Sequence, residues 1–150
     1  MKIGIISSNG GHLFQINQLD PIFQNYDHFW IVFRGKDSEY YIGKKNVYYT
    51  DYQNARNIIS FFIHCLKALI IFYKERPDIL ISCGAGISVP YFIMGKYIYR
   101  TKLIFIEPFD FIAYPSLTGK IINHFADLFL VQNKVQKKWY TKAKYWGSLL

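Results

Sequence analysis

A short polar stretch near the N-terminus holds the residue types best suited to chemistry: Ser7-Ser8-Asn9-Gly10-Gly11-His12. An apolar run precedes it, and residues 13–19 follow with apolar side chains at near-helical spacing. A strand, a glycine turn and a helix in this order point backbone N–H groups at an anion, and glycine lets that anion approach closely. His12 is the titratable side chain placed to meet such a ligand. An ordinary βα turn, with His12 as a helix-start residue, explains the same stretch equally well.

Two further loops carry candidate functional groups. A second glycine turn, Cys-Gly-Ala-Gly-Ile-Ser-Val-Pro at 83–90, follows another apolar run. Two carboxylates, Glu107 and Asp110, follow the apolar run 102–106, and Ser-Leu-Thr-Gly-Lys occupies 116–120. Because ligands of parallel sheets bind beyond the carboxyl ends of the strands, these loops are expected to converge on one cleft. None has the G-x-G-x-x-G spacing of dinucleotide-binding turns, which argues against a simple NAD domain.

Length predicts one domain, residues 1–150, large enough to bury a core. Hydrophobic residues make up 51% of the chain, yet no run reaches the roughly 20 residues that a transmembrane helix needs. The nearest candidate, 58–73, carries Ser60, His64 and Lys67 on one helical stripe. This pattern predicts a core helix or a helix on a membrane surface, with a partly solvated polar stripe.

The first residues of the sequence and its two cysteines predict the cellular compartment. Met1 and Lys2 lead directly into the first apolar run, so no signal peptide is expected and the chain is predicted to be cytoplasmic. Cys65 and Cys83 are predicted to be buried thiols rather than a disulfide. No metal site is predicted, because no cluster of cysteine and histidine has metal-ligand spacing.

The net charge of +8 is unevenly distributed. Five lysines and no acid lie within 128–150, and three basic residues and no acid lie within 79–106. A basic surface rich in aromatic residues attracts phosphate, whether in nucleic acid, anionic lipid or a diphosphate-linked substrate. For any single lysine, solubility charge on an exposed helix face is the simpler explanation.

Apolar runs and helical patterns alternate along the chain, which predicts an α/β, Rossmann-like, doubly wound and mainly parallel sheet. Residues 34–38 are predicted to form a polar turn, and Asp20-Pro21 to break the first helix. The expected helices are 13–19, a long helix ending near Arg76, one ending near Tyr99, one ending near Phe125, and 133–140. The expected strands are 3–6, 28–33, 46–49, 78–82, 102–106, 127–131 and 143–146.

Taken together, these motifs resemble a known family. Residues 8–12 and 84–90 are similar to the two glycine loops of inverting UDP-sugar transferases that act on polyprenyl-diphosphate acceptors, the MurG type. Glu107 and the Leu-Thr-Gly-Lys of 117–120 match in order and spacing. The phrases at 106–110 (Ile-Glu-Pro-Phe-Asp), 129–132 (Phe-Leu-Val-Gln) and 146–148 (Trp-Gly-Ser) resemble the bacterial PssD/CpsF group of capsule and exopolysaccharide proteins. That group is related to the membrane-recruiting subunit of the two-subunit GlcNAc transferase of asparagine-linked glycosylation.

The resemblance covers essentially the whole chain and implies the N-terminal, acceptor-side half of a GT-B glycosyltransferase. A separate small PssE- or CpsG-like subunit would bind the UDP-sugar, so no cofactor is expected on this chain, which would be inactive without that partner. The complex would transfer a hexose or GlcNAc to a polyprenyl-diphosphate-linked saccharide. Basic and aromatic surface would give peripheral contact with the inner leaflet, on the cytoplasmic face of the plasma membrane.

Site roles follow from the loops and the resemblance together. Glycines would cradle the acceptor diphosphate through their amides, because a Cβ would block the phosphate oxygens. The predicted diphosphate-binding residues are Ser8, Asn9, Gly10, Gly11, Gly84, Ala85, Gly86, Ser88, Thr118 and Lys120. The predicted catalytic residues are His12, Glu107 and Asp110, since an inverting transfer needs a base for the attacking hydroxyl.

Several alternatives stay open at this stage. Asp110 could instead cap the following segment, Glu107 could orient its loop, and Lys120 could pair with a carboxylate. A stand-alone Rossmann-type protein that binds a nucleotide or nucleic acid is the alternative function. No nucleic-acid partner is expected, because no helix-turn-helix or stacked-aromatic RNA motif accompanies the basic tail.

Overall fold

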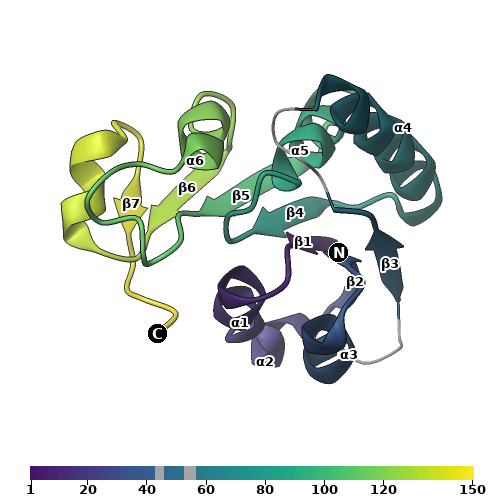
Figure 1. Cartoon of the computed structure of the whole chain (residues 1–150), viewed down its shortest axis with the longest axis horizontal. Coiled ribbons are helices and arrows are strands. Elements are labelled where there is room, and N and C mark those ends of the chain that lie inside the picture. Colours follow the sequence, from purple (N-terminus) through teal and green to yellow (C-terminus); the bar gives the residue numbers. More distant parts are fainter. Residues whose placement is uncertain (43–45, 53–56) are drawn as a thin grey trace.

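Seven parallel strands form one twisted sheet in the order β3-β2-β1-β4-β5-β6-β7, as drawn in Figure 1. The computed structural model describes residues 1–42, 46–52 and 57–150. The strands are β1 (Lys2–Ser7), β2 (Asp27–Phe33), β3 (Val47–Thr50), β4 (Ile79–Ser82), β5 (Lys102–Ile106), β6 (Leu128–Val131) and β7 (Lys144–Tyr145). The predicted doubly wound parallel sheet is confirmed.

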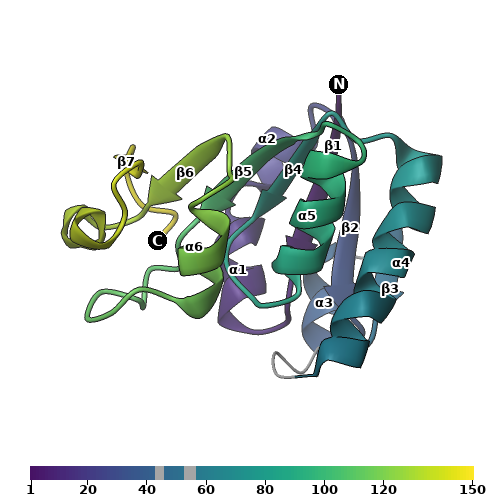
Figure 2. The ribbon, with the colours of Figure 1, turned by 90° about the horizontal axis from the view of Figure 1, so that it is seen from above.

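Helices cover both faces of the sheet, and Figures 1 and 2 show the two layers. One face carries α1 (Gly11–Asn17), α2 (Asp20–Phe23) and α3 (Lys36–Ile42), and the other carries α4 (Ile58–Glu75), α5 (Ser88–Tyr97) and α6 (Leu117–Ile122). A 3-10 helix, η1 (Lys134–Trp139), lies between β6 and β7. Two buried apolar clusters result, one on each face, which explains why the central strands are apolar on both sides.

The long helix α4 begins and ends where its flanking residues require. The Asn57 side chain accepts hydrogen bonds from the amides of Ile59 and Ser60, which caps the helix start. Arg76 adopts a left-handed conformation with φ of 50°, and Pro77 follows, so the helix cannot continue. The predicted end near Arg76 is confirmed.

One local prediction was wrong. The predicted polar turn at 34–38 opens α3, because the Ser38 hydroxyl bonds both polar groups of the Gly35 backbone and two acids stand in the first turn. The predicted break of the first helix at Asp20-Pro21 is confirmed, since α1 ends at Asn17; Asp20 then begins α2, whose first turn tolerates proline.

The prediction of a partly solvated polar stripe on the long helix was also wrong for its central residue, His64. His64 is 2% exposed and its Nδ1 lies 3.2 Å from the Thr50 hydroxyl, inside the fold. The outward stripe of α4 is apolar instead, and each of its members is at least 47% exposed: Ile59, Phe62, Ile63, Leu66, Ile70 and Tyr73. Among the described helices, none combines the length and hydropathy that crossing a bilayer requires.

Candidate functional site

The topology places the two glycine loops side by side. β1 and β4 are neighbours in the sheet although two strands, β2 and β3, lie between them in the sequence, and the chain winds outward from this pair in both directions. A crevice opens at such a switch point, beyond the carboxyl ends of the strands. The loop after β1 carries residues 8–12 and the loop after β4 carries 83–87. The predicted convergence of these two loops is confirmed.

His12 is held between the second glycine loop and the loop after β5. A Cβ added to Gly84 would lie 2.7 Å from His12 Nε2 and 2.5 Å from Pro108 Cγ, so the imidazole packs directly on the glycine backbone. On the other side, His12 Nδ1 lies 3.2 Å from the Ser8 hydroxyl oxygen. The imidazole therefore packs on Gly84 of the second glycine loop and contacts Ser8 of the first, rather than lying free at a helix end.

Burial lowers the pKa of His12 below its ordinary value, and the negative charge of Asp110 opposes that shift in part. A group with a lowered pKa is neutral at pH 7, the form that can accept a proton. Asp110 is itself exposed and lies close enough to His12 for its charge to act on the imidazole.

In the first glycine loop, the backbone amide of Gly10 is already hydrogen-bonded, and the space beside the next residue, Gly11, is open. The Gly10 amide donates to the Asp37 carboxylate at 3.0 Å, so an anion would have to displace Asp37 to reach it. Gly10 has φ of 76°, a conformation that favours glycine. Apart from the chain neighbours and the helix's own backbone, no heavy atom of the described residues lies within 4 Å of the Cβ position at Gly11. The fold itself therefore does not require a glycine at position 11.

The second glycine loop is braced by buried hydroxyls. Ser88 is 0% exposed and donates to the Gly84 carbonyl at 2.7 Å, and Ser82 contacts the same carbonyl at 2.9 Å. Ala85 has φ of 66°, which is unusual for a residue with a side chain. The structure places Ser88, a predicted diphosphate ligand, behind the loop, whereas Ala85 and Gly86 are half-exposed at its turn.

Glu107 lies inside the protein and is 0% exposed. Its carboxylate accepts hydrogen bonds from the Ser116 amide at 2.8 Å, the Ser116 hydroxyl at 3.0 Å and the Tyr140 hydroxyl at 2.7 Å. Burial raises the pKa of Glu107, while these donors oppose the shift. Its surroundings do not fit a base that meets substrate; they fit the alternative that the sequence allowed, a carboxylate that orients its loop.

Three buried glutamines, which the sequence analysis missed, hold the loop that carries Asp110. Gln15 Oε1 accepts from the Phe109 amide at 3.0 Å and from Gln132 Nε2 at 2.7 Å. Gln136 Nε2 donates to the Pro108 carbonyl at 2.8 Å. For Gln15, its position between Phe14 and Ile16 was the available signal, because a buried polar group needs partners.

The remaining predicted residues lie farther along the same edge. Thr118 and Lys120 lie on α6, which packs against α5 on the opposite face of the sheet from α1. Lys120 is exposed and Thr118 is half-exposed. Cys65 and Cys83 are buried free thiols, as predicted. Within 1–42, 46–52 and 57–150, no group of three or more His, Cys, Asp or Glu side chains could hold a metal ion.

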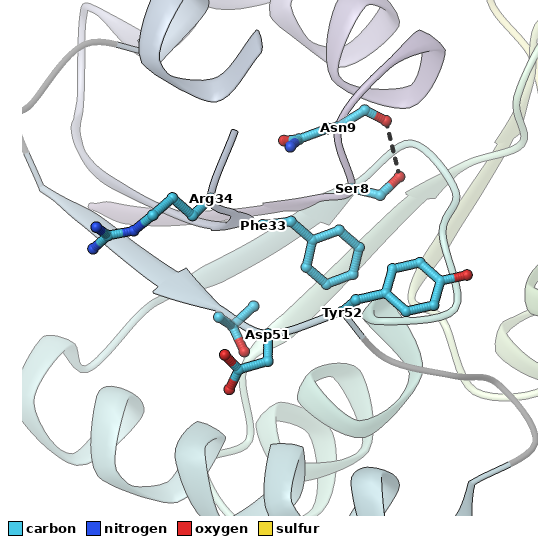
Figure 3. Close-up of a pocket in the computed structure, with 7 residues that line it drawn as sticks. Ser8, Asn9, Phe33, Arg34, Asp51 and Tyr52 are labelled. Atoms are coloured by element: carbon cyan, nitrogen blue, oxygen red, sulfur yellow. Dashed lines mark hydrogen bonds between the residues drawn. The ribbon is translucent and has the colours of Figure 1, made fainter. Parts of the chain in front are cut away.

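A cavity of about 540 Å³ opens beside the first glycine loop, on the side away from the second. Ser8 and Asn9 contribute to its wall together with residues that follow β2 and β3, as Figure 3 shows. These wall residues, apart from Ser8 and Asn9, were also missed, because their common position at strand ends emerges only from the sheet order.

Comparison with known proteins agrees with this geometry. Residues 45–149 match the family described as "Oligosaccharide biosynthesis protein Alg14 like". The chain is 26% identical over 85 residues to the human UDP-N-acetylglucosamine transferase subunit ALG14, covering 53% of this chain and 39% of the human protein. It is 25% identical to the Debaryomyces hansenii ALG14 subunit, covering 99% of this chain and 76% of that protein. The chain thus spans about two-fifths of the length of its mammalian relatives.

Solved structures share the fold. Acinetobacter baumannii MurG superposes with a TM-score of 0.77 at 12% identity, over 99% of this chain and 46% of MurG. UDP-N-acetylglucosamine 2-epimerase from Rickettsia bellii superposes with a TM-score of 0.73 at 15% identity, over 99% of this chain and 45% of the epimerase. At these identities the likeness concerns the fold, whereas the family match covers most of the sequence. The chain belongs to the Alg14-like family of oligosaccharide biosynthesis proteins.

Proposed function

We propose that this protein is the acceptor-side subunit of a two-subunit UDP-sugar transferase that extends a polyprenyl-diphosphate-linked saccharide. The observation that carries the proposal is His12, held between two glycine loops at the switch point with the exposed carboxylate Asp110 nearby. Family membership and the names of the ALG14 relatives, which are subunits of a UDP-N-acetylglucosamine transferase, support this assignment. The bacterial capsule or exopolysaccharide setting rests on the sequence resemblance.

His12 is the proposed general base. In an inverting transfer, a hydroxyl of the acceptor attacks the anomeric carbon of the donor sugar, the bond to UDP breaks, and the hydroxyl proton passes to a base. The Ser8 hydroxyl lies 3.3 Å from the Asn9 carbonyl; when it donates there, its oxygen accepts from His12 Nδ1–H. That tautomer leaves Nε2 unprotonated and able to accept the proton. Asp110 then stabilises the imidazolium that forms.

The acceptor diphosphate is proposed to bind the backbone of the glycine loops, at Gly11 and at the half-exposed turn of Ala85 and Gly86. No side chain among the described residues caps the start of α1, so its first amides are available to phosphate oxygens. Gly10 contributes only if Asp37 moves away from its amide. Lys120 and Thr118, at the same edge of the sheet, would meet the outer part of this ligand.

Peripheral membrane contact is proposed through the apolar stripe of α4. Its 18 residues extend about 27 Å, and Figure 2 shows this helix at the β3 end of the molecule. Lys67, Lys74 and Arg76 lie on or just after the helix, while its acid, Glu75, forms an ion pair with Lys2. An apolar face with a basic rim suits an anionic lipid surface. We expect Leu66→Glu to reduce sedimentation with anionic vesicles, and Tyr40→Glu on α3 to leave it unchanged.

The donor-binding partner is proposed to be a PssE- or CpsG-like subunit that holds the UDP-sugar. The C-terminal surface offers exposed aromatic rings paired with lysines: Lys134 with Tyr145, Lys138 with Trp139, and Lys144 with Trp146. Such rings are common in protein interfaces.

A sugar-transfer assay tests the proposal. Labelled UDP-sugars and membranes that carry lipid-linked acceptors are incubated with this protein, with the small partner, and with both. Transfer only when both are present supports the proposal, and His12→Ala in the complex should then lower the rate about 100-fold or more. Transfer by this chain alone overturns the accessory role. Absence of transfer together with tight binding of free nucleotide or nucleic acid supports the stand-alone binding protein instead.

A further inference from the structure

The cavity beside the first glycine loop is built from the ends of three parallel strands. Ser8 follows β1, Phe33 and Arg34 lie at the end of β2, and Asp51 and Tyr52 follow β3, and Figure 3 shows these residues around the cavity. Its volume of about 540 Å³ lies within the range of small-molecule sites, about 300–1,000 Å³. It shares Ser8 with the His12 site.

Two aromatic rings form an apolar wall in this cavity. The ring centroids of Phe33 and Tyr52 lie 5.5 Å apart and the rings are tilted by 47°. Phe33 is half-buried, but Tyr52 is 78% exposed. An aromatic ring left this exposed beside a concave polar surface offers a flat face to a ligand. The axial C–H bonds of a pyranose ring present a matching apolar face.

The charges in the wall balance one another. Arg34 provides one positive charge, and its guanidinium lies over the Tyr49 ring at 4.9 Å from the centroid. Asp51 provides one negative charge and forms an ion pair with Lys67 at 2.6 Å. Asp37, bonded to Gly10 at the adjoining loop, adds a further negative charge nearby. An arrangement with no net positive charge gives a phosphate no net attraction and suits a neutral ligand with hydroxyl groups, which can both donate to the carboxylate and accept from the guanidinium.

Asn9 adds an unused hydrogen-bonding group to the same wall. Its side-chain oxygen is buried and has no hydrogen-bond partner among the described residues. An unsatisfied buried acceptor is costly and calls for an explanation. A small rotation of this side chain toward the cavity would let a ligand hydroxyl donate to it.

We propose that this cavity binds the saccharide of the acceptor, with the sugar ring against Phe33 and Tyr52 and its hydroxyls at Asn9, Arg34 and Asp51. The inference rests on the proposed function, which makes this chain the acceptor side. Ser8 lies in the cavity wall and contacts His12 Nδ1, so the cavity adjoins the loop that holds the proposed base. In this arrangement the cavity orients the saccharide, and the glycine loops hold the diphosphate.

The test is a titration of the full-length, ¹⁵N-labelled protein with methyl N-acetylglucosaminide, methyl glucoside and uridine, each up to tens of millimolar. We expect at least one saccharide to shift the amide signals of Asn9, Arg34 and Asp51 in a saturable way. Tyr52→Ala should weaken that binding at least about tenfold, and Tyr52→Phe should retain it. Tyr40→Ala removes a similarly exposed ring, 83% exposed and packed edge-to-face against Tyr41, and should bind like the wild type.

Three results would overturn the inference: no saturable shift with either saccharide, shifts confined to another surface, or shifts at these residues with uridine alone. The titration needs neither the partner nor the donor. Saccharide binding without any transfer in the reconstituted complex would contradict the proposed function while leaving this site in place. Transfer without saccharide binding here would contradict the site alone.

Discussion

The two glycine loops look alike in the sequence but use their glycines in opposite ways. At Gly84, a Cβ would collide with His12 and Pro108, so the missing side chain is filled by the protein's own packing. At Gly11, the same position faces open space. His12 therefore lies next to both Gly84, which the fold needs as a glycine, and Gly11, which the fold does not. The difference indicates that the second glycine is required for packing, whereas the first leaves open the space that the proposed diphosphate would occupy.

The largest expected effect is on the second loop. Gly84→Ala should lower the free energy of unfolding by about 3 kcal/mol, because a positive φ costs about 1–2 kcal/mol for alanine and the collision with His12 adds overpacking. Urea unfolding measures this change in the free energy of unfolding. Gly10→Ala is the control for backbone strain alone, since its φ is also positive, no atom lies near the Cβ position among the described residues, and its ψ of −142° is strained for alanine; it should cost about 1–3 kcal/mol. A smaller loss for Gly84→Ala than for Gly10→Ala would contradict the packing role of Gly84.

Gly11→Ala should separate function from stability. Alanine suits a helix better than glycine and meets open space here, so the free energy of unfolding should stay within about 0.5 kcal/mol of the wild type or rise. Transfer by the reconstituted complex should fall about tenfold, equivalent to about 1.4 kcal/mol, because the new methyl group obstructs a diphosphate. Unchanged transfer in this variant would break the contrast between the loops.

A double-mutant cycle between the loops should show coupling of about 1 kcal/mol. In a His12→Ala background, Gly84→Ala should cost less than it does alone, because the imidazole no longer occupies the space of the new Cβ. Part of the cost should remain, since Pro108 also contacts that position. The measurement is urea unfolding of the four proteins, and strict additivity would show that His12 does not depend on Gly84 for its position.

The smallest expected effect is on the pH dependence of stability. Burial lowers the pKa of His12 below its unfolded value near 6.5, so the neutral form stabilises the fold. That contribution is complete above pH 6.5 and is lost as the pH falls through the lowered pKa. The urea midpoint of the wild type should therefore fall more between pH 7.5 and 5.5 than that of His12→Gln. His64, whose pKa burial also lowers, is common to both proteins and cancels in this comparison. Parallel pH profiles would mean that the second loop does not bury His12 enough to keep it neutral.

Local patterns were sufficient for much of the fold. The apolar runs that became β2, β4, β5 and β6 are continuous because both faces of the sheet are covered, and their ends were predicted to within a residue. The helix α3 was missed because its first turn is polar and its stability comes from hydrogen bonds of Ser38 to Gly35 and from packing of Tyr41. His64 was misplaced because polarity suggested solvent, whereas Thr50 supplies a buried partner.

The sequence by itself determined the alternation of strands and helices, the glycine loops and the presence of His12 at a strand end, because propensities, turn chemistry and periodicity are local. The tertiary structure decided which groups meet. Only the strand order places Gly84 against His12, buries Glu107 beneath Tyr140 and leaves Asp110 exposed, and gathers Arg34, Asp51 and Tyr52 around one cavity. These contacts join residues tens of positions apart, and their energies depend on burial and proximity, which no local pattern encodes.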